Sequence, residues 1–214
     1  MILGTSHEGE SDFREWLDRK RDLDGVLVTG YATDEDLQEL VRRRLPYMVM
    51  GNLDIDSAHP QERIDLVLGI KNAVLPRLCP FAGKRVAALI SSALFSAARE
   101  TAEGIKEALR DAGAVFDERL IMHCEGDGYQ ETARLLSEFK PDVVYVHGET
   151  YSGYARYFRL HQKMARPYTI VNTNGRFVAA RDICDESFFC DLYSDEVIRL
   201  AVNGLFAQIN RVTK

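Results

Sequence analysis

The chain has 214 residues, which is enough for one large α/β domain or two smaller ones. Its 46% hydrophobic and 28% charged residues are typical of a globular protein, and a net charge of −6 makes it a poor direct binder of a polyanion such as DNA. No apolar run reaches the roughly 20 residues that span a bilayer. The first residues have neither the basic nor the apolar region of a signal peptide. We therefore expect a cytoplasmic protein without membrane contact.

The predicted elements alternate between short apolar runs and longer helical patterns. In chain order, the predicted strands are Met1–Leu3, Gly25–Thr29, Tyr47–Met50, Val86–Ile90, Glu118–Met122, Val143–Val146, Thr169–Val171 and Phe188–Leu192. The helices predicted between them are Ser11–Arg21, Thr33–Arg43, Arg63–Leu78, Ser96–Ala112, Gln130–Phe139, Gly153–Met164 and Ser194–Arg211. Strands that alternate with helices in this way indicate parallel sheets covered by helices on both faces, which is the α/β class.

A change of composition at Leu75–Arg85 predicts a domain boundary. This segment contains two prolines and a glycine, which end a helix before the next strand begins. We predict a hinge that the chain crosses near Gly83 and again near Cys190. The expected lobes are residues 1–83 with 191–214, and residues 84–190.

Several segments together resemble one known family. Leu23–Gly30 resembles a "VDGIIL" strand, and Leu45–Asn52 is similar to "IPVVLVD". Residues 65–87 resemble "D-x-x-x-G-x-x-x-A-x-x-x-L" followed by "GHRRIA", and Gly104–Leu109 resembles "GFxxAL". Three further pieces, at Pro141–Gly153, Pro167–Asn174 and Val197–Ile209, are variants of "PDAVFxxND…G", "P-x-x-I-S-V-x-G-x-D" and "MGxxAVxxLLxxI". In this order they resemble the effector-binding domain of the LacI–GalR family of transcription regulators.

The resemblance implies a fold and a function. The fold is that of the periplasmic binding proteins of type I: two parallel-sheet, three-layer lobes joined by a hinge of several crossovers. The chain is expected to be truncated at both ends, because Met1 stands where the family has its second strand and the last helix precedes the family's closing strand. A DNA-binding helix-turn-helix has no counterpart in these residues. The implied partners are a small effector, usually a sugar, and a second copy in a homodimer.

In this fold the effector lies at the carboxyl ends of strands from both lobes. We expect polar and aromatic residues at those ends to bind a polyhydroxylated ligand, with hydroxyls, amides and carboxylates paired to its hydroxyls and aromatic rings against its apolar face. The predicted ligand-binding residues are Tyr31, Asn52, Asp65, Ser92, Phe95, Thr101, Tyr129, His147, Glu149 and Asn174.

The opening turn of the helix Ser96–Ala112 departs from the family. An effector-binding arginine of the family corresponds to Thr101 here, and Arg99 lies two residues earlier. Two such residues are about 200° apart on a helix, so they face nearly opposite sides. We predict that Thr101 faces the ligand and Arg99 faces away.

Each of these residues also has a purely structural interpretation. Asp65 can be a helix-capping charge, Arg99 a solvated surface charge and His147 a core histidine, while Asn174-Gly175 forms a turn signal. Phe95 and Tyr129 can be core aromatics, and the hydroxyls of Ser92 and Thr101 can mark helix starts.

Catalysis and metal binding are disfavoured. Glu125 and Asp127 form an acidic pair, and His123 stands beside Cys124, but adjacent strand residues point to opposite faces. The four cysteines stand singly, and no hydrolase, phosphate-loop or zinc-protease motif occurs. We therefore expect no enzyme, no cofactor and no metal. Two functions remain, a ligand-sensing domain of a regulator or a solute-binding protein of a transport system.

Overall fold

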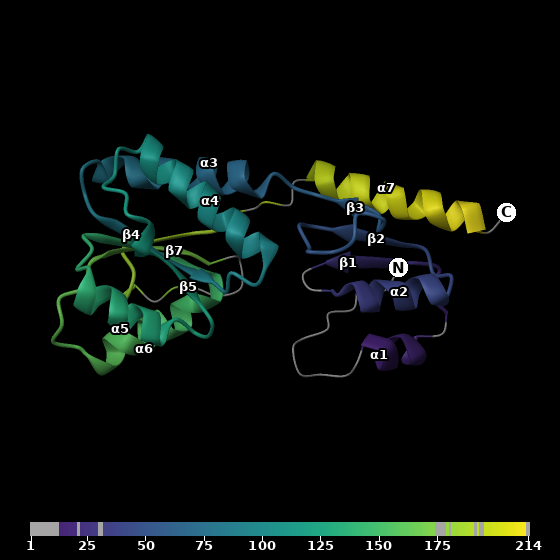
Figure 1. Ribbon diagram of the computed structural model, residues 1–214, viewed down its shortest axis with the longest axis horizontal. Helices are drawn as coiled ribbons and strands as arrows, with labels where there is room; N and C mark the ends of the chain where they lie inside the picture. Colours follow the sequence, from purple (N-terminus) through teal and green to yellow (C-terminus); the bar gives the residue numbers. More distant parts are fainter. Residues whose placement is uncertain are drawn as a thin grey trace. The chain divides into compact units, whose positions relative to one another are not determined.

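The computed structural model describes residues 13–20, 22–29, 32–173, 179, 181–190, 192 and 195–212. The chain forms two compact units. Unit 1 comprises Met1–Ile64 and Tyr193–Lys214, and unit 2 comprises Asp65–Leu192. Each unit has its own parallel sheet with helices on both faces (Figure 1). The predicted strand Met1–Leu3 lies outside the described residues.

Unit 1 is built on a three-stranded sheet in the order β1-β2-β3. Valine side chains such as Val28 and Val49 pack with Leu37 in one apolar core. On the other face, Met48 packs with Leu205 in a second core. The elements are α1 (Phe13–Arg19), β1 (Val26–Thr29), α2 (Asp34–Arg42), β2 (Tyr47–Met50), β3 (Gln61–Glu62) and α7 (Asp195–Val212).

Unit 2 is a larger three-layer structure with a five-stranded sheet in the order β5-β4-β6-β7-β8. Figure 1 shows α3 and α4 on one face of this sheet and α5 and α6 on the other. Its helices are α3 (Leu66–Leu78), α4 (Ser96–Asp111), α5 (Tyr129–Glu138) and α6 (Tyr151–Leu160), with short 3-10 turns η1 (Cys79–Phe81), η2 (Glu118–Leu120) and η3 (Gly148–Thr150). Its strands are β4 (Val86–Ser91), β5 (Ile121–Cys124), β6 (Val143–His147), β7 (Tyr168–Asn172) and β8 (Glu186–Phe188).

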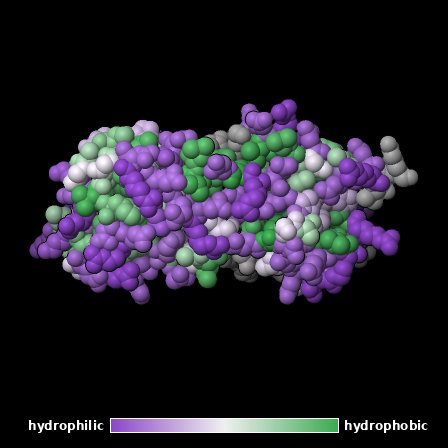
Figure 2. All heavy atoms as spheres, turned by 45° about the horizontal axis from the view of Figure 1, so that its top comes forward, coloured by the Kyte–Doolittle hydropathy of each residue, from purple (hydrophilic) through white to green (hydrophobic). Residues whose placement is uncertain are grey.

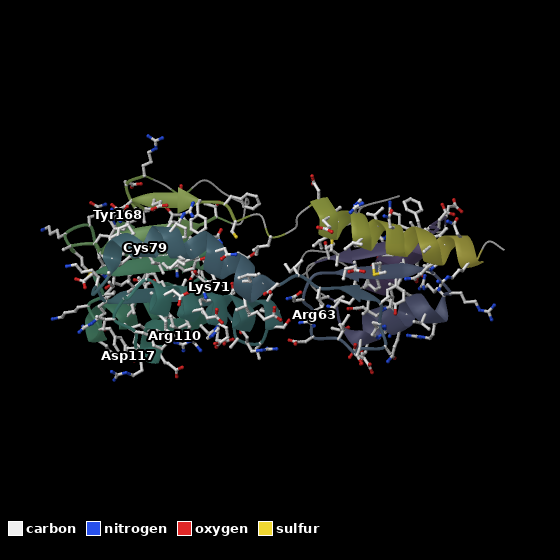
Figure 3. All side chains as sticks on the ribbon, turned by 90° about the horizontal axis from the view of Figure 1, so that it is seen from above. Arg63, Lys71, Cys79, Arg110, Asp117 and Tyr168 are labelled. Carbon is white, nitrogen blue, oxygen red and sulfur yellow. The ribbon has the colours of Figure 1, made fainter. Side chains whose placement is uncertain are left out.

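The division into units differs from the predicted one at α3. This helix belongs to unit 2, so the chain passes between units at Ile64–Asp65 rather than near Gly83, and it returns at Leu192–Tyr193. The reason is the close packing of α3 on α4. A Cβ atom at Gly104 would lie 2.6 Å from the carbonyl oxygen of Val67, so only glycine allows this approach. Lys71 on α3, labelled in Figure 3, adds ion pairs to two carboxylates of α4.

Two predicted strands are displaced along the chain. The strand predicted at Glu118–Met122 is found at Ile121–Cys124, because the Asp117 carboxylate accepts the backbone N–H of Arg119 at 3.0 Å and starts a 3-10 turn. The strand predicted at Phe188–Leu192 ends at Phe188. The two-residue strand β3 was not predicted, since so short a segment carries no periodic pattern.

Candidate functional site

The candidate site lies at the carboxyl edge of the unit 2 sheet. Parallel strands end at a common edge, and the register places Ser91 beside Cys124 and His147 beside Asn172. Polar residues therefore gather where β4, β5, β6 and β7 end. This is the edge at which open parallel sheets bind small molecules.

Ser92 and Glu125 meet at this edge, directly after β4 and β5. The Ser92 hydroxyl donates to Oε2 of Glu125 at 2.9 Å and accepts from the backbone N–H of Leu94 at 3.2 Å. Ser92 is buried whereas Glu125 is exposed, so the serine orients a carboxylate that water and ligands can reach. Ser92 was predicted to bind the ligand, whereas Glu125 was considered only as part of an acidic pair for catalysis.

A second group surrounds Tyr129 at the start of α5. Its ring packs on Tyr157 with centroids 5.5 Å apart, and the guanidinium of Arg156 lies 4.6 Å from its centroid. Arg156 also pairs with Asp127 at 2.9 Å. The loop is held by Gly153, whose N–H donates to the Asp127 carbonyl at 2.9 Å. The half-buried Tyr129 ring is thus held in place by side chains of unit 2.

His147, at the end of β6, belongs to a buried polar cluster that also contains Tyr145 and Asn172. The Tyr145 hydroxyl lies 3.0 Å from Nδ1 of His147, and Asn172 donates to that hydroxyl at 3.3 Å. Burial lowers the pKa of His147 to about 4 and raises that of Tyr145. His147 is therefore neutral near pH 7.

Tyr145 and Asn172 were not among the predicted ligand-binding residues. Tyr145 shares a strand face with His147 two residues on, which is a visible signal in the sequence. Asn172 becomes relevant only once β7 is paired with β6 in register.

At the start of α4, Arg99 lies on the exposed side of the helix and Thr101 on its buried side. Arg99 is exposed, and its Nη1 donates to the carbonyls of Ala93 and Leu94 at 2.8 and 3.1 Å. Thr101 is 3% exposed on the buried side of the helix, whereas Phe95 is 40% exposed at the N-cap. The Arg99 guanidinium is thus hydrogen-bonded to the loop that precedes its own helix.

Other predicted residues have structural roles or lie elsewhere. The Asn52 amide exchanges two hydrogen bonds with the backbone of Ile64, at 2.8 and 2.9 Å, within unit 1. Asp65 caps α3 by accepting from the N–H of Leu68 at 3.0 Å. Glu149 is exposed in η3. Tyr31 and Asn174 lie outside the described residues.

The described residues offer no group of three or more histidine, cysteine, aspartate or glutamate side chains that could hold a metal ion. Burial, followed by the charge of Glu131, raises the pKa of the Cys124 thiol to about 12, so this sulfur is not a ready nucleophile. None of the described helices is both long and apolar enough to cross a bilayer.

A hollow of about 520 Å³ lies at the opposite, amino edge of the unit 2 sheet. It is lined by residues that include Arg85, Phe116, Arg119 and Phe139. Both arginines are engaged within the protein: Arg85 donates to the Phe139 carbonyl at 2.6 Å, and Arg119 pairs with Asp117 at 2.6 Å. None of the predicted ligand-binding residues lines this hollow.

Comparison with known proteins gives structural matches only. No family model matches the chain, and neither does any curated protein sequence. The transcription regulator CcpA of Lactococcus lactis is 20% identical, with a TM-score of 0.67 over 93% of this chain and 74% of that one. A LacI-family regulatory protein from Chloroflexus aggregans is 18% identical, with a TM-score of 0.69 over 96% and 76%. The transcriptional regulator CelR in complex with cellobiose is 22% identical, with a TM-score of 0.67 over 92% and 64%.

These matches confirm the predicted fold. Two α/β units, each with a parallel sheet, have the periplasmic-binding-protein-like fold of the effector domains of LacI-family regulators. The chain is shorter than the proteins it matches, since it covers 74% and 76% of the first two.

Proposed function

We propose that this chain is the ligand-sensing domain of a LacI-type transcription regulator and binds a small polar effector such as a sugar. The observation that carries the proposal is the polar carboxyl edge of unit 2, where Ser92, Glu125 and His147 stand on a fold shared with transcription regulators. One similar structure is a complex with cellobiose. The role is binding rather than catalysis, in the cytoplasm.

The chemistry of this edge suits a neutral polyol. A sugar hydroxyl can donate to the Glu125 carboxylate and accept from a neutral imidazole such as that of His147. The exposed carboxylates of Glu125 and Glu149 disfavour a strongly anionic ligand by repulsion. With a net charge of −6, the domain leaves DNA contact to a helix-turn-helix module.

A thermal-shift screen tests the proposal. The panel contains cellobiose, common monosaccharides, sugar acids and nucleosides, each added in excess. A ligand at 100 times its dissociation constant stabilises the folded protein by about 2.7 kcal/mol, which is a readily measured shift. No stabilisation by any neutral sugar of the panel would contradict the proposal.

Matched variants locate the site of a hit. Glu125→Gln should weaken the shift, because it removes the carboxylate that Ser92 orients. Glu118→Gln makes the same chemical change at the amino edge of unit 2, in η2, and should leave the shift unchanged. Equal effects of both variants would place the ligand elsewhere.

We also propose a homodimer formed through α7 of unit 1. On this helix Ile198 and Phe206 are 39% and 53% exposed and lie about 80° apart around the axis, so they share one side of it. Figure 2 shows apolar surface over this helix. Helix α2 lies on the opposite face of the unit 1 sheet (Figure 1) and exposes Val41. A single two-fold interface cannot centre on both faces, and α7 offers the larger apolar surface.

Sedimentation tests the dimer. At micromolar concentration the chain should sediment at twice its mass of 24.2 kDa, and Phe206→Glu should shift it towards the monomer. Val41→Glu on α2 is the control and should leave the dimer intact. A monomeric wild-type chain would contradict the proposal.

A further inference from the structure

The hollow at the amino edge of the unit 2 sheet has a volume of about 520 Å³. This is within the range of about 300–1,000 Å³ that is usual for small-molecule sites. Its lining combines charged and aromatic side chains, including Arg85, Arg119, Asp117, Glu138, Phe116 and Phe139. Such a lining suits a ligand that has one charged group on an apolar body.

The two arginines of the hollow use different N–H groups. Arg119 pairs with the Asp117 carboxylate through Nε at 3.0 Å and Nη2 at 2.6 Å. Arg85 instead donates to the Phe139 carbonyl through Nη1 at 2.6 Å. Nε and Nη2 of Arg85 make no hydrogen bond to any residue that the structure describes. This pair of nitrogens, the side-on fork of the guanidinium, binds a carboxylate through two parallel hydrogen bonds, as in the Arg119–Asp117 pair.

The apolar walls of the hollow are two phenylalanine rings, each in contact with a guanidinium. The Phe116 ring centroid lies 5.0 Å from Cζ of Arg110, and the Phe139 ring centroid lies 5.6 Å from Cζ of Arg119. Arg110 and Asp117, the residue after Phe116, are labelled in Figure 3. Cation–π contacts at these distances help to orient the rings. Both rings are half-buried, so each keeps apolar surface for a ligand.

The charges around the hollow favour a ligand with one negative charge. Asp117 and Arg119 neutralise each other as an ion pair. Among the other side chains that line the hollow or cover its rings, Arg85 and Arg110 carry two positive charges against the single negative charge of Glu138. One positive charge is left over, in a chain whose net charge is −6. A monoanion balances this local excess, whereas a dianion exceeds it.

We propose that this hollow is a second ligand site, which binds a small monocarboxylate with an aromatic or branched aliphatic body. Arg85 holds the carboxylate through Nε and Nη2, and the apolar body lies against Phe116 and Phe139. The exposed carboxylate of Glu138 repels a second negative charge, so a dicarboxylate binds less tightly. The site uses no residue of the carboxyl edge, so it does not depend on the proposed function.

Calorimetric titration of the full chain tests the proposal. The probes are phenylacetate, 3-phenylpropanoate and 4-methylpentanoate, and we expect at least one of them to bind. For an aromatic probe that binds, 2-phenylethanol has a similar body but no charge and should bind at least about tenfold more weakly. Succinate should also bind more weakly. No binding of any probe at about 10 mM, or equal affinity for 2-phenylethanol, would overturn the proposal.

Matched variants test the role of Arg85. Arg85→Gln removes the charge and the fork but keeps an amide that can donate to the Phe139 carbonyl, and it should weaken binding of the probe at least about tenfold. Arg134→Gln makes the same change at an exposed position of α5 outside the hollow and should leave the affinity unchanged. Glu138→Gln should raise the affinity for succinate more than that for the monocarboxylate. Equal affinities in Arg85→Gln and Arg134→Gln would overturn the proposal.

Amide NMR of the ¹⁵N-labelled chain locates the probe without any substitution. A bound probe should shift the signals of residues 115–120 and 138–139 and leave those of Ser92 and Glu125 at the carboxyl edge unchanged. Shifts confined to the carboxyl edge would overturn the proposal. If no sugar of the thermal screen binds while a monocarboxylate binds at the amino edge, the proposed function fails and this site stands.

Discussion

The two units bury different kinds of side chain. In the described part of unit 1, the buried polar groups are Glu39, Asn52 and the hydroxyl of Tyr47. Glu39 pairs with Arg14 of α1 and with Arg42 and Arg43. Asn52 bonds to the backbone of Ile64, and the Tyr47 hydroxyl to Nδ1 of His59. Unit 2 buries the hydroxyls of Tyr145 and Tyr154 and a further set of polar side chains, namely Ser92, Ser96, Thr101, Thr132, Thr150, Thr169, Asn172 and Thr173.

This contrast suggests that the two units are specialised. A buried polar group needs a partner at a particular distance and angle, and leaving it unpaired costs about 1–3 kcal/mol. Apolar contacts have no such direction and tolerate small shifts. We therefore expect unit 2 to be the more sensitive to substitution and to determine ligand specificity. The apolar side chains exposed on α7 suit unit 1 to assembly.

The largest expected difference comes from one substitution made in both units. Gly153 on α6 approaches the loop before α5 so closely that a Cβ atom would lie 2.3 Å from the Asp127 carbonyl oxygen and 2.4 Å from the Tyr129 nitrogen. Backbone cannot yield as a flexible side chain can. We expect Gly153→Ala to lower the free energy of unfolding of unit 2 by roughly 3 kcal/mol, measured by urea denaturation.

Gly204→Ala on α7 is the counterpart in unit 1. Its Cβ would meet the terminal methyl of Met48 at 2.5 Å, and that flexible end can move aside. Alanine also favours a helix by up to about 1 kcal/mol over glycine. The stability of unit 1 should therefore change by less than about 1 kcal/mol. Equal losses in the two variants would remove the distinction between the units.

The second-largest effect is expected at Asp185, before β8. Its carboxylate accepts hydrogen bonds from Nη2 of Arg166 at 3.0 Å and from the backbone N–H of Thr169 at 2.7 Å. These bonds connect the start of β8 to β7. Asp185→Asn keeps the size but loses the charge-assisted bonds, which should cost roughly 2–3 kcal/mol. Hydrogen exchange should quicken in β7 and β8 but not in β1 and β2.

A surface pair provides the control. Glu103→Gln breaks an exposed pair with Lys106 on α4, which should cost no more than about 0.5 kcal/mol. Two results would contradict this prediction. One is a loss of unfolding free energy in Asp185→Asn no larger than that in Glu103→Gln, and the other is hydrogen exchange that quickens equally in β1 and β2. Either would show that the hydrogen bonds of Asp185 do not stabilise β7 and β8 in particular.

The strands of the fold could be predicted because their cores are short runs of β-branched and apolar residues. Val86–Ile90 and Val143–Val146 are found within one residue of their predicted ends. The domain boundary could not be placed from composition alone. The proline-containing segment before Gly83 does contain the end of α3 at Leu78, but this end is not a boundary between units. Helix α3 belongs to unit 2 because Val67 packs against Gly104, and this contact joins residues distant in sequence.

The candidate site was predictable only where a strand end identifies it. His147 and Ser92 follow apolar runs, so the sequence points to them. Tyr145 lies two residues before His147 on the same strand and could have been predicted, whereas Asn172, which donates to the Tyr145 hydroxyl, depends on the register between β6 and β7. Asn52 and Asp65 match the family's motifs, yet their side chains bond to nearby backbone groups.

The third prediction concerns acid stability. The pKa of His147 is lowered to about 4 by burial, against about 6.5 in an unfolded chain. Between these values the unfolded state binds more protons, so stability falls as the pH falls from 6.5 towards 4. Unit 2 should lose at most about 2 kcal/mol between pH 7 and pH 5 through this group. His147→Gln should flatten that slope, whereas replacing the exposed His161 by glutamine should retain it. An unchanged slope in His147→Gln would show that His147 titrates normally.

The smallest expected effect lies at the start of α4 and is measured as affinity for a sugar found in the thermal screen. Arg99 is committed to the carbonyls of Ala93 and Leu94, so Arg99→Ala should leave the dissociation constant within a few-fold. Thr101, at 3% exposure, stands where the family's motif has an effector-binding arginine. Thr101→Val keeps the shape and removes one hydroxyl, which should weaken binding by about 1 kcal/mol, the scale of one hydrogen bond. The reverse pattern in a calorimetric titration would mean that Arg99 leaves its loop to contact the ligand, and that the specificity of unit 2 extends beyond its buried hydroxyls.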